Sequence, residues 1–352
     1  MLTFHPLELR RRTSIAEDAF CLEFRAPPAL EEAYRFEAGQ HLAIRATLAG
    51  RELRRTYSIV SPVGGKLRIG VRVQGEMSRY LAEGLRIGDT LDALEPTGRF
   101  KPTIEPGRAK SYVAVAAGSG ITPVLSIVST LLAAEPFCRV LLVYANRAIG
   151  RTMFLDEVLA LKDRYLERFR VQCLMSREPQ DVELFNGRLD AARMRELAST
   201  EFDPRAVDEF FICGPGTMVR ELTATLRELG AAGKVHFERF AVEGAAKTAI
   251  ASAAPSAKPT EAEVTVTIDG RRRSFAMQSG RTILESAEAA GLALPYSCRA
   301  GVCSTCRTKV VSGTVTMERN QALEDWEVQA GYVLCCQARP SGNRVELSYD
   351  EK

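Results

Sequence analysis

Alternating apolar and polar residues mark the first part of the chain, residues 1–107. The alternation is clearest at 42–47, 53–60 and 67–73, and glycine and proline residues separate these stretches. A short helix is expected at about 78–83. Successive side chains of a strand point to opposite faces, so a period of two predicts strands that bury one face. Short strands broken by turns favour a small antiparallel β-barrel for this part.

Continuous apolar runs replace the alternation in residues 108–240. The runs lie at 112–116, 140–144, 171–174 and 209–213. Amphipathic segments separate them. The clearest of these, at about 215–229, carries an apolar stripe from Val219 to Leu229 and is followed by Gly230, a typical helix end. Buried strands that alternate with helices indicate an α/β fold with a doubly wound parallel sheet.

Residues 241–262 are rich in Ala, Ser, Pro and Lys and are expected to form a flexible linker. The alternative is a short Ala-rich helix, and Pro255 and Pro259 argue against one continuous helix.

Residues 263–352 are expected to form short strands and a short helix. An alternating strand at 264–268, the turn pair Asp269-Gly270 and a second strand to about Phe275 predict a hairpin. Thr282 and Glu285 have the spacing of a capping box, which opens a helix that Gly291 ends. A hairpin, a helix and then a long loop predict a small α+β domain of the β-grasp type.

Four cysteines in this last part have the most informative spacing in the chain. Four residues separate Cys298 from Cys303, two separate Cys303 from Cys306, and Cys336 follows after a gap of 29 residues. This is the plant-type spacing for a [2Fe–2S] cluster. The residues between the first three cysteines are mostly small, so the loop can wrap tightly and direct backbone N–H groups at sulfur. The spacing therefore predicts a one-electron carrier.

A structural zinc site and unmodified buried cysteines are the alternatives. A lone Cys-x2-Cys pair favours zinc, whereas the gap of four, the small-residue loop and the distant fourth cysteine favour iron and sulfide. Cys335 is adjacent to Cys336, and only one of them can be the fourth ligand. Cys336 is expected, because the segment 332–337 resembles the ferredoxin ending in which the ligand directly precedes Gln or Val.

Composition and charge narrow the function classes. The 352 residues carry a formal charge of only +3 with the basic residues spread out, which does not indicate nucleic-acid binding. Residues 1–12 lack the apolar core of a signal peptide, and no run approaches the roughly 18 apolar residues that span a membrane. Iron-binding thiolates also suit a reducing compartment. A soluble, cytoplasmic protein of two or three domains is expected.

The chain has only three histidines, His5, His41 and His236. None of them follows a glutamate by three positions, and no Cys-x-His pair is present. Carboxylate di-iron sites and Rieske centres need such ligands. Oxygen-activating metal chemistry is therefore not expected on this chain.

Two motifs in the first part fit a flat cofactor with a pyrophosphate. Arg55 and Tyr57 share a face of a predicted strand, where a ring can stack and a guanidinium can bind phosphate. Ser58 can hydrogen-bond a ring nitrogen. Residues 75–78 (Gly-Glu-Met-Ser) open the short helix, whose N–H groups attract anions. An ordinary amphipathic strand, and an N-cap role for Ser78, are the alternatives.

Two glycine motifs follow strands of the predicted parallel sheet. Gly118-Ser-Gly120-Ile-Thr-Pro123 begins a helix after the first strand, which is the place where a dinucleotide phosphate binds. Cys213-Gly-Pro-Gly216 ends the last predicted strand; its glycines let a planar ring approach the backbone, and the thiol could contact that ring. The alternatives are a turn needed only for packing and a buried apolar role for Cys213.

In this order and spacing, the motifs resemble the ferredoxin–NADP reductase superfamily over essentially the whole chain, with a plant-type ferredoxin fused at the C-terminus. The resemblance implies an FAD-binding β-barrel at 1–107, an NAD(P)-binding domain at 108–240 and a [2Fe–2S] ferredoxin domain at 263–352. One departure is Ala38-Gly39-Gln40, where the family usually has Pro-Gly-Gln.

The resemblance also implies residue roles at the flavin. Arg55 and the backbone around Gly75, Met77 and Ser78 would hold the pyrophosphate. Tyr57 would stack on the ring system and Ser58 would reach its N5 atom. Phe240 would cover the flavin until the nicotinamide displaces it, although an exposed residue before the linker is the alternative.

The residues that the resemblance implies for the nicotinamide are Gly118, Ser119, Gly120, Thr122, Pro123, Cys213, Gly214, Pro215 and Met218. Tyr57, Ser58 and Cys213 would act where the hydride is transferred. Ser176-Arg177 resembles the Ser-Arg pair that binds a 2′-phosphate in plant-type reductases, with Arg147 placed to assist. Cationic donors there favour NADPH over NADH, and surface arginines without this role are the alternative.

Barrel segments 32–42 and 51–59 resemble the reductase subunits of multicomponent ring-1,2-phenylacetyl-CoA epoxidases. This implies FAD as the flavin, a di-iron epoxidase as the partner and a place in phenylacetate degradation. Reductases of other aromatic or steroid hydroxylases share most of these motifs and are the alternative. A non-catalytic redox sensor is the alternative from another class. Electrons would arrive from NADPH in pairs and leave through the cluster one at a time.

Trp326, the only tryptophan, is flanked by Glu324, Asp325 and Glu327. An acidic face with an aromatic side chain could dock a partner protein. A solvated loop with a packed tryptophan is the alternative.

Overall fold

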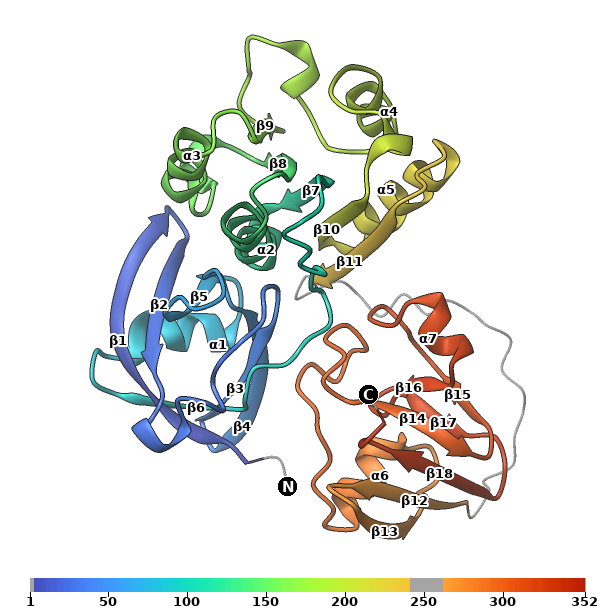
Figure 1. Cartoon of the computed structure of the whole chain (residues 1–352). Helices are drawn as coiled ribbons and strands as arrows, with labels where there is room; N and C mark the ends of the chain where they lie inside the picture. Colours follow the sequence, from blue (N-terminus) through green and yellow to red (C-terminus); the bar gives the residue numbers. More distant parts are fainter. Residues whose placement is uncertain (1–2, 241–261, 352) are drawn as a thin grey trace. The chain divides into compact units, whose positions relative to one another are not determined.

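The computed structural model describes residues 3–240 and 262–351 (Figure 1). The chain divides into two compact units: one holds residues 5–53 and 57–240, and the other consists mainly of the C-terminal part. The predicted linker lies outside the described residues except for Ala262. That residue is buried, and its carbonyl accepts a hydrogen bond from the Met277 N–H, so it already belongs to the C-terminal domain.

The first part is an antiparallel sheet in the order β4-β3-β6-β1-β2-β5. Its strands are β1 (His5–Ala16), β2 (Ala19–Arg25), β3 (His41–Leu48), β4 (Arg51–Ser58), β5 (Leu67–Arg72) and β6 (Thr90–Ala93). Ile59, directly after β4, bridges to Ile69 of β5 and closes the sheet into a barrel. The predicted short helix is α1 (Glu76–Arg79), which continues in a wider turn at Tyr80–Gly84.

The pattern of buried residues explains the barrel. Leu67, Ile69 and Val71 of β5 alternate into its core, as the period of two predicts. β2 is buried on both faces: Phe20 and Leu22 enter the barrel core, whereas Cys21 enters the core of the second part. A continuous apolar strand of this kind lacks the alternation, and the sequence analysis did not identify it.

The second part is a parallel five-stranded sheet in the order β11-β10-β7-β8-β9. The strands are β7 (Ser111–Ala117), β8 (Arg139–Asn146), β9 (Phe169–Met175), β10 (Glu209–Pro215) and β11 (Lys234–Phe240). The helices are α2 (Ile121–Ala134), α3 (Leu155–Arg164), α4 (Ala191–Thr200) and α5 (Gly216–Glu228). Separate apolar cores, one with α2 and α3 and one with α4 and α5, cover the two faces of the sheet. The predicted doubly wound fold is confirmed.

Charged and polar side chains join the barrel to the parallel-sheet domain. Asp18, in the turn between β1 and β2, accepts hydrogen bonds from Arg72 at 2.8 and 3.0 Å and pairs with Arg151 of the second part. Arg72 also donates to the Arg151 carbonyl at 2.7 Å. Ser126 of α2 donates to the Ser61 carbonyl at 2.6 Å. These bonds fix the two parts against each other as one unit.

Replacing Asp18 with Asn is expected to destabilise this unit. The substitution leaves two arginines without their carboxylate, and breaking a fully buried pair costs about 3–5 kcal/mol. Because the Asp18 side chain is 23% exposed, we expect a smaller loss of about 2 kcal/mol, measured by thermal or urea unfolding. The exposed pair Arg195–Glu228 is the control, and Arg195→Gln should leave the melting temperature unchanged. Equal melting temperatures for all three proteins would contradict the prediction.

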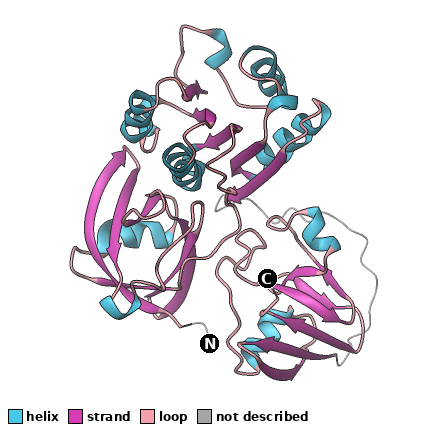
Figure 2. Cartoon of the chain, in the orientation of Figure 1, coloured by secondary structure: helices cyan, strands magenta, loops and turns pink. Residues whose placement is uncertain are grey.

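The C-terminal part has a five-stranded sheet in the order β13-β12-β18-β14-β16 and a two-stranded ribbon of β15 and β17 (Figure 2). Its strands are β12 (Glu263–Ile268), β13 (Arg271–Ala276), β14 (Arg307–Ser312), β15 (Val315–Met317), β16 (Tyr332–Leu334), β17 (Ala338–Pro340) and β18 (Arg344–Ser348). Its helices are α6 (Ile283–Ala289) and α7 (Asp325–Gln329).

The predicted hairpin and capping box are confirmed in this part. Asp269 and Gly270 both have positive φ, as the tight turn between β12 and β13 requires. The Thr282 hydroxyl accepts a hydrogen bond from the Glu285 N–H at 3.3 Å, and the Thr282 N–H donates to the Glu285 carboxylate at 2.8 Å. α6 then packs its apolar face on the domain core.

Candidate functional site

Strand β4 carries three of the predicted flavin residues. Arg55 and Tyr57 are partly exposed, and Tyr57 packs at the edge of the barrel core. Ser58 is only 5% exposed and points to the other side of the strand, as alternation requires. The strand can therefore offer a ring and a guanidinium on one face and a buried hydroxyl on the other.

The turn before α1 does not have the cap that the sequence suggested as an alternative. Gly75 is the N-cap, and Ser78 lies three residues inside. The Ser78 hydroxyl accepts the N–H groups of Gln74 and Gly75, each at 2.9 Å. The Met77 and Ser78 side chains are buried. Only backbone N–H groups of the first helical turn, which have no partner within a helix, remain as donors for a phosphate.

A buried carboxyl group beside Ser58 was missed by the sequence analysis. Glu238 of β11 lies beside the Ser58 hydroxyl, and burial raises the pKa of its carboxyl to about 8, against a lowering effect of that hydroxyl. Its Oε1 lies 3.8 Å from Nδ1 of His41, a residue of β3 that is 3% exposed. Two strands of the barrel and one of the parallel sheet thus bring three polar side chains together. Glu238 lies two residues before Phe240, but no local motif marks it.

The glycine motif after β7 forms a tight turn into α2. Gly118 has φ of +54°, and the Tyr144 hydroxyl donates to its carbonyl at 3.3 Å. Thr122 donates to the Ser119 carbonyl at 2.9 Å and, like Pro123, is buried. A Cβ on Gly120 would lie 2.2 Å from the Cys213 carbonyl oxygen, so this position requires glycine. The two glycine motifs therefore pack directly against each other.

Residues 213–218 end β10 and begin α5. Cys213 is fully buried, and burial raises the pKa of its thiol well above the usual value, so the thiol stays protonated. A Cβ on Gly214 would lie 2.7 Å from Cε of Met218. Pro215 pairs in register with Phe240 of β11. Phe240 is partly buried against the core that contains Cys213, so it is not the exposed residue of the alternative interpretation.

The predicted phosphate donors come together at the ends of β8 and β9. The Ser176 N–H donates to the Asn146 carbonyl at 3.0 Å, and the Arg177 N–H donates to the Arg147 carbonyl at 2.9 Å. Both arginine side chains are exposed. The carboxyl ends of parallel strands are where nucleotides bind in open α/β sheets.

Three of the four predicted cluster cysteines, Cys303, Cys306 and Cys336, are buried, and Cys298 is partly buried. Side-chain contacts with Cys303 and then Cys336 hold the pKa of the Cys298 thiol far below its usual range. Cys336 contacts Cys298 and Cys306 in turn, and these contacts raise the pKa of its own thiol. The structure brings the four thiols together in this way.

The neighbouring Cys335 has different side-chain partners from Cys336. It is fully buried, and burial raises the pKa of its thiol, with Tyr349 as a hydrogen-bonding neighbour. The two cysteines lie in the turn that follows β16, and only Cys336 makes side-chain contacts with both Cys298 and Cys306. Cys336 therefore faces the other cysteines, and Cys335 faces the domain core.

The cysteine loop has the donors and the tight turns that a cluster needs. The Ala300 N–H donates to Sγ of Cys298 at 3.3 Å. Gly301 has φ of +73°, and a Cβ there would lie 3.1 Å from the Arg319 carbonyl oxygen. Among the described residues, no group of three or more His, Cys, Asp or Glu side chains is placed to hold a single metal ion. The fit to a cluster therefore rests on the pairwise thiol contacts and the N–H donor.

The acidic face around Trp326 is only partly present. Trp326 is 56% exposed on α7, and its indole N–H donates to Glu324 at 2.8 Å. Glu327 is instead fully buried and forms an ion pair with Arg307 at 2.9 Å. It helps to hold α7 in place and is not part of a surface.

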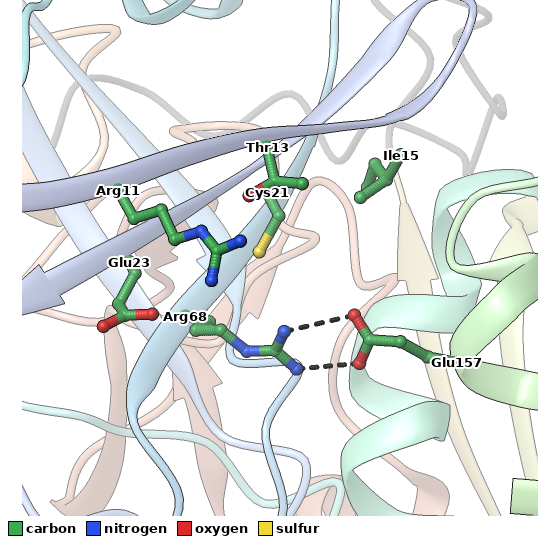
Figure 3. Close-up of a pocket in the computed structure, with 7 residues that line it drawn as sticks. All are labelled: Arg11, Thr13, Ile15, Cys21, Glu23, Arg68 and Glu157. Atoms are coloured by element: carbon green, nitrogen blue, oxygen red, sulfur yellow. Dashed lines mark hydrogen bonds and ion pairs between the residues drawn. The ribbon is translucent and has the colours of Figure 1, made fainter. Parts of the chain in front are cut away.

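A hollow of about 170 Å³ lies elsewhere, between the barrel and α3 (Figure 3). Arg68 and Glu157 form a two-bond ion pair on one wall, at 3.1 and 2.8 Å. Cys21 also lines the hollow, and burial raises the pKa of its thiol to about 11. None of the predicted site residues lines this hollow.

Three family models match the chain in the predicted order. They are an oxidoreductase FAD-binding domain at residues 6–101, an oxidoreductase NAD-binding domain at 114–223 and a 2Fe-2S iron-sulfur cluster binding domain at 266–341. Within the described residues, no helix is long and apolar enough to cross a membrane.

Relatives match over the full length. The chain is 40% identical to one of the subunits of the 1,2-phenylacetyl-CoA epoxidase of Escherichia coli K12, over 100% of this chain and 99% of that protein. It is 29% identical to the ferredoxin reductase component of the 3-ketosteroid-9-alpha-monooxygenase of Rhodococcus rhodochrous, over 94% of this chain and 93% of that protein. The solved structure of phthalate dioxygenase reductase matches with a TM-score of 0.58 and 26% identity, over 98% of each chain.

Proposed function

The chain belongs to the ferredoxin–NADP reductase-type flavoproteins that carry a fused [2Fe–2S] ferredoxin domain, and from this premise we propose that it delivers electrons from NADPH to a phenylacetyl-CoA epoxidase. The protein is an NAD(P)H-dependent electron-transfer reductase of the kind that serves oxygenases. The choice of epoxidase rests on one observation, the 40% identity to the Escherichia coli epoxidase component over the full length of both chains.

The flavin site is proposed on the residues of β4 and the turn before α1. FAD, when bound, accepts two electrons together and passes them on singly. Tyr57 would hold the ring system by stacking, while Arg55 and the first-turn amides that follow Gly75, up to Ser78, would bind the pyrophosphate. Ser58 would present its hydroxyl to the ring, backed by Glu238, which can hold or release a proton.

The nicotinamide site is proposed at the carboxyl ends of β7 and β10. Gly118 leaves the backbone open to a phosphate at the start of α2, and Gly120 lets this turn pack against Cys213. Because the Cys213 thiol is neutral and buried, it would offer an apolar contact and not a nucleophile. Phe240 would exclude water from the ring of the flavin when no nicotinamide is present.

Arg177→Ala is expected to weaken binding of NADPH but not of NADH. The guanidinium would pair with the 2′-phosphate, which only NADPH carries. We expect KM for NADPH to rise about tenfold with kcat nearly unchanged, consistent with about 1.5 kcal/mol for one charged hydrogen bond. Steady-state kinetics with both nucleotides measures this.

Arg170→Ala is the matched control for Arg177→Ala, because Arg170 is an exposed arginine near the start of the same strand, β9. Its kinetic constants should equal those of the wild type. An equal rise in KM for NADPH and NADH in Arg177→Ala would contradict the role in 2′-phosphate recognition.

The acceptor is tested by reconstitution. The purified chain is combined with oxygenase subunits of the phenylacetyl-CoA epoxidase type or of the 3-ketosteroid hydroxylase type, and NADPH consumption coupled to substrate is measured. We expect coupled turnover only with phenylacetyl-CoA and its di-iron subunits. The steroid system is the second candidate, because its reductase is 29% identical over nearly the full length. Absence of steady NADPH turnover with any artificial acceptor would favour a redox sensor.

A further inference from the structure

Helix α2 lies between the barrel and the parallel sheet and is buried along most of its length (Figure 1). Its apolar side chains share one core with strands β7 and β8 on one side and with barrel residues such as Cys21 and Val60 on the other. Apolar packing is not directional, so it does not by itself fix the position of a helix along its own axis. Hydrogen bonds require particular atoms to meet, and they can fix that position.

Two hydroxyl groups of α2 bond to the backbone of the barrel. The Ser126 hydroxyl donates to the Ser61 carbonyl at 2.6 Å and accepts the Gly39 N–H at 3.4 Å. The Thr130 hydroxyl accepts the Val63 N–H at 3.1 Å and donates to the Ser126 carbonyl of its own helix at 2.8 Å. Ser126 is fully buried and Thr130 is 7% exposed. Directional bonds at two points therefore join the helix to the barrel.

The spacing of the two hydroxyls matches the spacing of their partners in the barrel. Ser126 and Thr130 lie about one turn apart on the same face of α2, which is about 6 Å along the axis. The Cα atoms of Ser61 and Val63 can be at most about 7 Å apart. A shift of α2 along its axis would lengthen or misalign both bonds at once, and misaligned hydrogen bonds weaken steeply. The segment 61–63 therefore fixes the position of α2 along its axis.

The barrel segment 61–63 is itself held in place. Pro62 lies between the two bonded residues, and its ring fixes the φ angle there. The Gly65 N–H donates to the Pro62 carbonyl at 2.9 Å, and Nε of Arg68 on β5 donates to the Ser61 hydroxyl at 3.0 Å. The segment begins three residues after Ser58. It thus connects the proposed flavin strand, β4, to the helix that begins at the nicotinamide motif.

Strand β5 meets the first turn of α2 with no side chain between them. A Cβ on Gly70 would lie 2.6 Å from Cγ2 of Thr122 and 2.7 Å from Cε2 of Phe154. Thr122 is one of the proposed nicotinamide residues and donates to the Ser119 carbonyl at 2.9 Å. The nicotinamide motif is therefore in direct contact with the barrel. A movement of α2 along its axis would carry this motif with it.

We propose that Ser126 and Thr130 are positioning residues that set where the nicotinamide motif stands relative to the flavin strand, and thereby the distance that the hydride crosses. This inference rests on the proposed function. The hydride leaves the nicotinamide with its electron pair and adds to the flavin, and neither hydroxyl takes part in that step. The rate is sensitive to such positioning, because a displacement of about 1 Å can cost about 100-fold.

The double variant Ser126→Ala/Thr130→Val removes both hydroxyls and tests the proposal. In the flavin-loaded protein, the limiting rate of flavin reduction by NADPH should fall at least about tenfold. The KM for NADPH should change by less than about twofold, because the residues proposed to bind the nucleotide are unchanged. The variant Ser126→Ala/Thr130→Ser, which returns one hydroxyl, should recover part of the lost rate.

Thr223→Val is the matched control. Thr223 is a buried residue of α5, and its hydroxyl donates to the Val219 carbonyl four residues earlier at 2.7 Å, as the Thr130 hydroxyl does in α2. Because α5 packs on the other face of the sheet, this change leaves the contact between α2 and the barrel intact. Its reduction rate should equal that of the wild type. An equal loss of rate in Thr223→Val and in the double variant would overturn the inference.

Two further readouts separate positioning from a general loss of stability. Stacking of NADP⁺ on the reduced flavin gives a long-wavelength charge-transfer absorption whose intensity depends on the distance between the rings. This absorption should weaken in the double variant and persist in Thr223→Val. Hydrogen–deuterium exchange of the Val63 amide, followed by mass spectrometry on the full-length protein, should be at least about tenfold faster in Thr130→Val than in the wild type.

A wild-type reduction rate and charge-transfer absorption in the double variant would overturn the inference, as would unchanged exchange of the Val63 amide in Thr130→Val. If the double variant does not fold, Ser126→Ala takes its place, because it removes a single oxygen atom. Its reduction rate should fall at least about threefold, and a wild-type rate would again overturn the inference. A wild-type protein whose flavin is not reduced by NADPH would overturn the proposed function instead.

Discussion

Cys336→Ser is expected to abolish electron delivery to an external acceptor, whereas Cys335→Ser is expected to preserve it. The two cysteines are adjacent, equally conservative to replace and both buried. Only Cys336 faces Cys298 and Cys306. Loss of one thiolate ligand removes the cluster or changes its potential. Reduction of cytochrome c or of the partner oxygenase, together with iron and sulfide content, measures the effect.

The same experiment separates the flavin from the cluster. Cys303→Ser should also abolish delivery to the acceptor, yet hydride uptake from NADPH should remain largely intact in both variants, because the flavin and nicotinamide residues other than Arg55 lie in the other compact unit. Stopped-flow bleaching of the flavin measures this uptake. Normal acceptor reduction in Cys303→Ser, or loss of iron in Cys335→Ser but not in Cys336→Ser, would show that the proposed ligand set is wrong.

Gly120→Ala is expected to cause the largest loss at the nicotinamide site. An added Cβ would lie 2.2 Å from the Cys213 carbonyl oxygen and 3.1 Å from the Gly214 nitrogen. Both are backbone atoms, so no side chain can rotate away, and the two glycine motifs must move apart. A shift of about 1 Å in such a site can cost about 100-fold in rate. We expect hydride transfer to fall by at least that factor, with a stability loss of about 1–3 kcal/mol from overpacking.

Gly107→Ala is the control for Gly120→Ala. It makes the same Gly-to-Ala change, but a Cβ on Gly107 would meet no atom within 4 Å, and Gly107 is not one of the proposed site residues. Single-turnover flavin reduction by NADPH measures the loss of hydride-transfer rate. Thermal unfolding of the same variants measures the loss of stability. Dithionite should still reduce the flavin in Gly120→Ala, because only the nicotinamide position is disturbed. Wild-type hydride transfer in Gly120→Ala would contradict the close contact between the motifs.

The sequence determined the features that depend on neighbouring residues. The period of two in β5, the capping box at Thr282 and the turn at Asp269 are local, because backbone geometry within a few residues sets them. The spacing of the cysteines is also a local property, since one loop supplies the first three of the proposed ligands. These patterns indicated the three domains and their order, which the family matches bear out.

Only the tertiary structure decided which side chains meet across the sheets. β2 is buried on both faces and therefore shows no alternation, and Glu327 turned out to be an internal ion-pair partner and not a surface residue. Ser58, Glu238 and His41 lie on three strands far apart in the sequence. Their contact depends on strand order and register, which arise from the packing of the whole barrel against the parallel sheet. A pattern read along the chain carries no information about that packing, so the buried acid beside Ser58 could not be predicted from it.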